Sequence, residues 1–85
     1  MSRAEKIFGK MKNTKHGWTP EDLHTVYIGY GFNFREGSRH TIYYHPDYPD
    51  LMATVARHSY IVVGYIQTAI KLIEKLQELK GGNPK

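Results

Sequence analysis

The spacing of apolar side chains changes twice along the chain, and this limits the fold more than any other sequence feature. Apolar residues recur at helical intervals in the N-terminal third and again from about Val63. Between them, Phe32 and Phe34 alternate with a polar residue, and the following segments are rich in β-branched and aromatic side chains. The sequence therefore predicts helix, helix, three antiparallel strands, helix. Because helices can cover only one face of such a sheet, we expect a two-layer α+β fold with the other face partly open.

Helix-capping and helix-terminating residues predict where the helices begin and end. The first helix has one apolar stripe, formed by Ala4, Ile7, Phe8 and Met11. Thr19 and Pro20 are a favourable N-cap and first helical residue for the second helix, and Gly31 is a favourable end. The last helix should stop at Gly81, leaving 81–85 as a flexible tail.

Turn residues divide the middle of the chain into strands. Gly37-Ser38 is expected to be a two-residue hairpin loop, followed by a strand from Arg39 to His45. The composition of residues 46–50 predicts a turn, and residues 51–57 predict a third strand.

Length and composition exclude several classes of protein. The chain has 85 residues and no cysteine, which leaves room for one small domain and excludes disulfides and cysteine–zinc clusters. The longest apolar run, residues 60–63, is far short of a membrane span, and no signal-peptide pattern opens the chain. We therefore expect a cytoplasmic protein that needs no membrane.

The positive charge is concentrated near the N-terminus. The net charge is +4, and residues 1–16 alone contain five bases against one acid, so the remainder is neutral. The three arginines of that remainder, Arg35, Arg39 and Arg57, all lie in the middle of the chain. Clustered arginines suit phosphate, so this distribution permits a nucleic-acid partner, although solubilising surface charge explains it equally well.

The segment from Arg35 to His40 contains the densest group of reactive side chains. It places two guanidinium groups, the Ser38 hydroxyl and the His40 imidazole around a tight turn, where Gly37 permits a positive φ. A histidine can exchange a proton near neutral pH while arginines hold a phosphate. This set suffices for attack of an RNA 2′-hydroxyl on its own phosphodiester without a metal. The alternative is a polar hairpin turn followed by a half-buried strand histidine.

No metal or cofactor site is expected from the sequence. The five histidines show no HExxH or other ligand spacing, and His40 and His45 should point to opposite faces of one strand.

Several short motifs, in their order and spacing, resemble the HicA-type mRNA interferase toxins over roughly residues 18–79. They are Gly31-Phe32, Gly37-Ser38-Arg39-His40, His45-Pro46-Asp47, the segment 54–58 (Thr-Val-Ala-Arg-His) and the segment 64–70 (Gly-Tyr-Ile-Gln-Thr-Ala-Ile). The resemblance implies a double-stranded-RNA-binding-domain-like fold, ribosome-independent mRNA cleavage and a HicB-type antitoxin partner. His40 matches the catalytic histidine of the Gly-Ser-x-His motif. The resemblance thus divides the chain into a basic N-terminal extension (1–17) and a HicA-like domain (18–80).

The chain departs from the family pattern between His40 and the His-Pro turn. This stretch is about one residue longer than usual, which predicts a bulge in the strand.

The remaining polar residues have weaker assignments. We expect Arg35, Ser38, Arg39, Arg57 and His58 to contact RNA phosphate, with His58 as either a second acid/base group or a strand-end residue that bonds a backbone carbonyl. Tyr43 and Tyr44 are candidates for base stacking or simply for packing. His16 and His24 are expected to have no role. A non-catalytic RNA-binding module and a protein-interaction module of the same fold remain as alternative functions.

Overall fold

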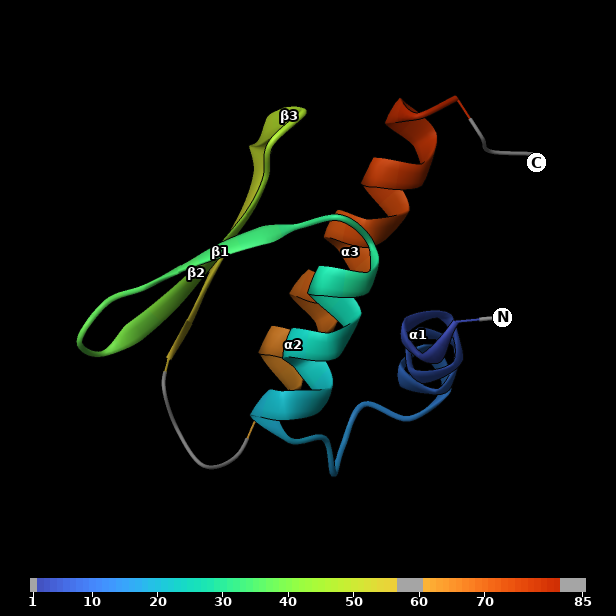
Figure 1. The fold of residues 1–85 in the computed structure, drawn as a ribbon. Coiled ribbons are helices and arrows are strands. Elements are labelled where there is room, and N and C mark those ends of the chain that lie inside the picture. Colours follow the sequence, from blue (N-terminus) through green and yellow to red (C-terminus); the bar gives the residue numbers. More distant parts are fainter. Residues whose placement is uncertain (1, 57–60, 82–85) are drawn as a thin grey trace.

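A computed structural model of the chain describes residues 2–56 and 61–81. The elements are α1 (Arg3–Asn13), α2 (Pro20–Gly29), β1 (Asn33–Glu36), β2 (His40–His45), β3 (Tyr48–Ala56) and α3 (Val63–Leu79) (Figure 1). This order confirms the predicted α+β fold class.

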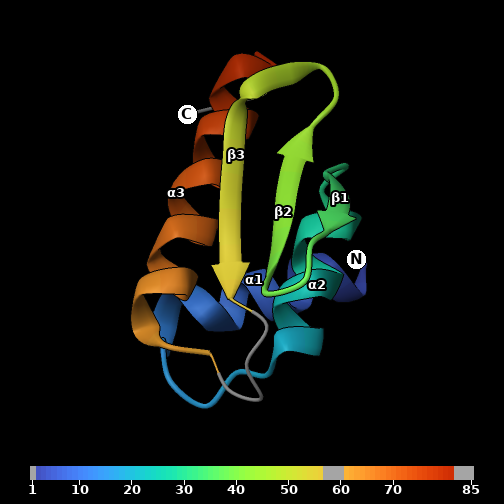
Figure 2. The ribbon, with the colours of Figure 1, turned by 90° about the vertical axis from the view of Figure 1, so that its left-hand side faces the viewer.

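The three strands form one antiparallel sheet in the order β1-β2-β3. All three helices lie on the same side of it, so the sheet stands in front of them in Figure 2. The core lies between these two layers and takes buried side chains from α1, α2, α3 and the strands. In the part of the chain that is described, no helix is long and apolar enough to cross a membrane.

Helix α1 packs into this core rather than projecting from it. A capping box joins Ser2 and Glu5 at its start. Phe8 and Met11 are buried in the main core cluster. Ala4 lies so close to Gly29 of α2 that any side chain at Gly29 would collide with it. The basic N-terminal segment and the following elements therefore share one core, and the assignment of 18–80 alone to a HicA-like domain stays a prediction.

Both ends of α2 follow the sequence signals. Thr19 and Asp22 form a capping box, with Pro20 at the first helical position. At the other end, Gly31 has φ +93°. The N–H of Gly31 donates to the carbonyl of Ile28, and the N–H of Phe32 donates to the carbonyl of Tyr27. This is a Schellman motif, completed by the contact between the Tyr27 and Phe32 rings, whose centroids lie 5.0 Å apart.

The strands differ from the expected boundaries at both turns. β3 begins at Tyr48 instead of residue 51, so the second turn contains only Pro46 and Asp47. Pro49 is tolerated inside β3 because this strand lies at the edge of the sheet. β2 begins at His40 instead of Arg39, and the predicted end of the third strand at Arg57 falls outside the described residues.

The irregularity between β2 and β3 lies at the end of β2. Tyr44 pairs with Met52 but the next residue, His45, pairs with Tyr48. The structure therefore has an irregularity in the stretch where the sequence predicted a bulge, and the unpaired residues opposite it, 49–51, belong to β3. The sequence located the irregularity but not the strand that contains the unpaired residues.

Candidate functional site

The face of the sheet that the helices leave uncovered holds His40. Residues that pair directly across strands share a face, and successive residues alternate. Tyr43, its partner Ala53 and Val55 are buried beneath the helices. Their neighbours therefore lie on the opposite face, which we call the open face: Asn33, Arg35, His40, Ile42, Tyr44, Met52, Thr54 and Ala56.

Arg35 and His40 are diagonal neighbours on the open face. Arg35 of β1 pairs with Ile42 of β2, and His40 lies two residues before Ile42. Diagonal residues of an antiparallel pair are about 7–8 Å apart, a separation that two long polar side chains can bridge through one phosphate group. Both residues are exposed. Within the described residues, no carboxylate lies within 4 Å of the charged nitrogens of Arg35 or Arg39, so their positive charge is not neutralised by an ion pair.

The hairpin loop places Ser38 and Arg39 at its tip. The N–H of Gly37 donates to the carbonyl of His40 at 2.8 Å, so the two central residues are Ser38 and Arg39, not the expected Gly37-Ser38. Gly37 also does not adopt the left-handed φ that its place in the motif permits. The loop is shifted by one residue because Gly37, directly after the end of β1, bonds to His40 instead of occupying a central position of the turn. Ser38 and Arg39 are both exposed beside His40.

Two of the expected site residues, Arg57 and His58, lie outside the described residues. Ala56, the last described residue of β3, pairs with His40. β3 therefore ends beside the first residue of β2, at the hairpin end of the sheet.

His45, unlike His40, is a packing residue. It is 4% exposed, which fits the expectation that the two histidines point to opposite faces. Its Nδ1 accepts the backbone N–H of Asp47 at 3.1 Å and so closes the Pro46-Asp47 turn. Its ring lies 5.3 Å from Phe32 and 5.3 Å from Tyr48, and its Nε2 would lie 3.2 Å from a Cβ at Gly31.

The two neighbouring tyrosines of β2 have different surroundings. Tyr44 is half-buried on the open face beside Met52. Tyr43 is buried, its ring stacks on Tyr27 at 4.4 Å, and its hydroxyl lies 2.8 Å from Nδ1 of His24. Burial, with a smaller contribution from Glu36, raises the pKa of Tyr43 to about 12. Of these two tyrosines, only Tyr44 therefore lies where it could stack on a base at the open face.

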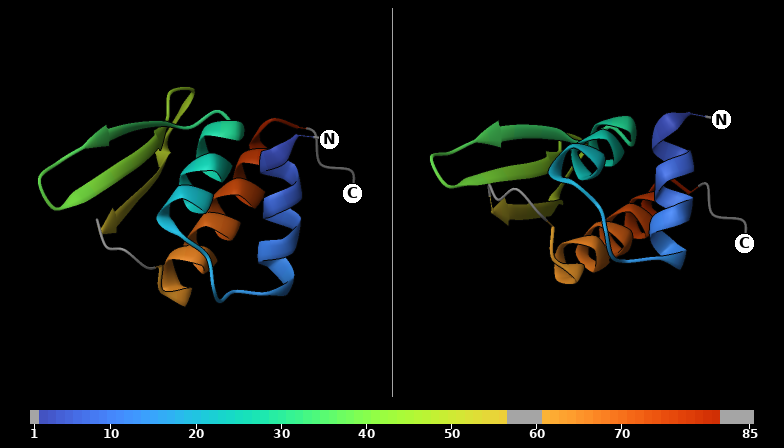
Figure 3. Two further views of the ribbon diagram at one scale, coloured as in Figure 1. Left: turned by 60° about the horizontal axis from the view of Figure 1, so that its bottom comes forward. Right: turned by 90° about the horizontal axis from the view of Figure 1, so that it is seen from below.

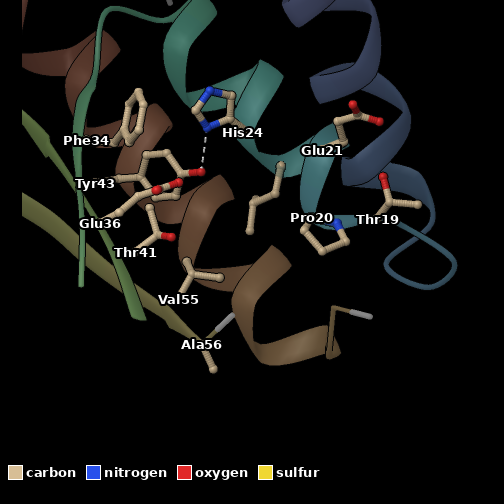
Figure 4. A pocket seen from close by; sticks show the side chains of 11 residues that line it. Thr19, Pro20, Glu21, His24, Phe34, Glu36, Thr41, Tyr43, Val55 and Ala56 are labelled. Carbon is tan, nitrogen blue, oxygen red and sulfur yellow. Dashed lines mark hydrogen bonds between the residues drawn. The ribbon is translucent and has the colours of Figure 1, made fainter. Parts of the chain in front are cut away.

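A pocket of about 710 Å³ lies on the other side of the sheet, between α2 and the hairpin end of the strands (Figure 4). Its walls are Thr19, Pro20, Glu21, Leu23, His24, Phe34, Glu36, Thr41, Tyr43, Val55 and Ala56. Figure 4 shows His24 above the Tyr43 hydroxyl, and the Phe34 ring packs edge-on against His24 at 4.8 Å. Sequence reasoning gave His24 no role, because nothing in the local pattern of α2 pairs it with a strand residue.

Among residues 2–56 and 61–81, no three His, Asp or Glu side chains gather as a metal ion would require. A metal-independent chemistry remains a prediction from the sequence. The comparisons with models of protein families, with curated proteins and with solved structures find no match for this chain.

Proposed function

We propose that this protein is a HicA-type toxin, an endoribonuclease that cleaves mRNA without a metal and uses His40 as its acid/base group. The observation that supports it best is the cross-strand register, which puts Arg35 and His40 on one exposed face beside a loop tip that presents Ser38 and Arg39. No other histidine of the described residues lies on the open face, because His45 is buried, His24 faces the pocket on the helix side, and His16 lies in the loop between α1 and α2.

The proposed reaction is an internal transesterification. His40 accepts the proton of a ribose 2′-hydroxyl, the freed oxygen attacks the adjacent phosphorus, and the bond from phosphorus to the 5′ oxygen breaks. The leaving oxygen takes up a proton, which gives a cyclic 2′,3′-phosphate end and a 5′-hydroxyl end. The guanidinium groups of Arg35 and Arg39, together with Arg57 and His58 from the sequence assignment, hold the phosphate and stabilise the charge that develops on its oxygens. The Ser38 hydroxyl adds a further contact to phosphate.

The proposed partner is a HicB-type antitoxin that covers the open face in the cytoplasm. The face combines Arg35 and His40 with the apolar side chains of Ile42, Tyr44 and Met52, and Met52 is 56% exposed. Apolar anchors beside unpaired cations suit a protein that offers acidic groups and excludes RNA.

The same apolar residues support a second candidate, a protein-interaction module without catalysis. In that case Ile42, Tyr44 and Met52 form the contact surface and His40 is dispensable. A non-catalytic RNA-binding module would keep the arginines but would also tolerate the loss of His40.

Expression in cells separates these functions. Induction of the chain should arrest growth, the His40→Ala variant should not, and Lys71→Gln on the exposed side of α3 should arrest growth like the parent chain. Arrest that persists with the His40→Ala variant would exclude the catalytic proposal, and absence of arrest by the parent chain would favour the interaction module.

A further inference from the structure

We propose that α1 forms a second RNA-binding surface, which holds a single-stranded segment outside the site on the open face. This second surface goes beyond the proposed function because it includes none of the sheet residues. In Figures 1 and 3, α1 lies across α2 and α3 and away from the sheet.

Three basic residues of α1 form a row on one flank of the helix. Arg3, Lys6 and Lys10 are exposed, and at 3.6 residues per turn they lie within about 60° of one another around the axis. The row is about 10 Å long at 1.5 Å per residue. Nucleic-acid strands repeat about every 3.4 Å when stacked, so the row spans roughly three nucleotides.

The charge of this row is not neutralised within the described residues. None of the three cations has a carboxylate within 4 Å. The single acid of residues 1–16, Glu5, instead accepts the Ser2 N–H at 3.0 Å in the capping box. The other lysines of the segment are engaged elsewhere, since Lys12 lies 4.9 Å from the centre of the Phe8 ring and Lys15 donates to the carbonyl of Lys12. Arg3, Lys6 and Lys10 therefore present an open row of positive charge.

A hollow of about 480 Å³ lies at the C-terminal end of this row. It is lined by Lys10, Asn13, Thr14, His16, Gly17 and Trp18. The indole N–H of Trp18 donates to the carbonyl of Thr14 at 2.7 Å and fixes the ring in the wall of the hollow. Gly17 also lines the hollow, has φ +82°, and has open space where a Cβ would lie.

The row of cations and the hollow beside it fit single-stranded RNA better than a membrane. A row of cations that leads to an aromatic ring is the arrangement with which proteins hold a phosphate backbone and stack a base. Asn13, Thr14 and His16 add hydrogen-bonding groups for base edges or a 2′-hydroxyl. An anionic membrane would instead require exposed apolar residues on the helix, whereas Ala4, Phe8 and Met11 are buried against α2 and α3.

The only tryptophan of the chain allows a direct test. The full-length His40→Ala protein, which should not cut the probe, is titrated with an oligoadenosine of about ten nucleotides while Trp18 fluorescence is recorded. The emission should be quenched on binding. Lys6→Gln with Lys10→Gln should weaken binding by roughly 25-fold at 0.1 M salt and lower the slope of log affinity against log salt by about 1.4, because two phosphate contacts are lost.

A matched pair of lysine substitutions at α3 distinguishes a specific contribution of α1 from a general effect of lost positive charge. Lys71→Gln with Lys80→Gln removes two exposed lysines at α3 and should leave the slope and the quenching unchanged. RNA binding that leaves Trp18 emission unaltered, or an equal effect of both lysine pairs, would overturn the inference. So would the absence of RNA binding, or quenching by phosphatidylserine vesicles or by oligoglutamate that equals quenching by the oligoadenosine.

Discussion

His24 and Tyr43 lie 19 residues apart and meet as one hydrogen-bonded pair beside the pocket. Periodicity predicted that α2 packs on the sheet, but not which polar side chain of α2 would meet which strand residue. That contact depends on how α2 lies over β2, which no local signal encodes. By contrast, the opposite faces of His40 and His45 followed from strand geometry alone.

The buried tyrosines should make the protein less stable in alkali. The folded-state pKa of Tyr43 is about 12, and burial also raises that of Tyr27. Because the unfolded phenol ionises near pH 10, the contribution of Tyr43 to stability is complete below about pH 10 and is lost as pH rises toward about 12. Urea unfolding at about pH 9 and about pH 11 should show a falling free energy of unfolding.

Tyr43→Phe is the control for this alkaline effect. The variant lacks the phenol that ionises, so its free energy of unfolding should fall less over the same interval than that of the parent chain. An identical fall in both proteins would show that Tyr43 is accessible and ionises normally.

At the scale of elements, the ends of the helices were the most predictable features. Thr19 and Gly31 act through hydrogen bonds within a few residues, and Pro20 acts through its own fixed φ, so the local sequence contains the whole signal. The strand ends were less predictable because Pro46 and Pro49 both indicate a turn, and only pairing with β2 shows that Pro49 belongs to an edge strand. Nothing in the sequence alone indicated that α1 would pack against Gly29.

Because α1 packs against α2, two similar glycine substitutions should change the stability of the protein in opposite directions. Gly9→Ala adds a methyl group in open space and should stabilise α1 by about 0.5–1 kcal/mol. Gly29→Ala adds a methyl group that collides with Ala4 and should destabilise the protein by about 1–3 kcal/mol, since α1 must move away.

Chemical denaturation of the two variants checks this prediction. A Gly29→Ala variant that is as stable as Gly9→Ala would mean that α1 is not packed against α2 in solution.

At the scale of the whole molecule, the uncovered face of the sheet is the feature that a partner should occupy. If a HicB-type antitoxin binds there as proposed, hydrogen exchange of the complex should slow in residues 39–44, which contain His40 and Tyr44. The arrangement of three helices on one side leaves this face free for direct occlusion. Protection confined to residues 64–80 of α3, with residues 39–44 still exchanging freely, would show that inhibition is indirect.

The most direct test of the proposed ribonuclease activity is the rate at which the purified protein cleaves a single-stranded mRNA fragment, with and without His40. The parent chain should cleave it in the presence of EDTA, and His40→Ala should lower the rate by about 10²–10⁴-fold while its circular dichroism spectrum stays the same. Unchanged cleavage by a folded His40→Ala variant, or loss of the parent activity in EDTA with rescue by magnesium or zinc, would contradict a metal-independent reaction centred on His40.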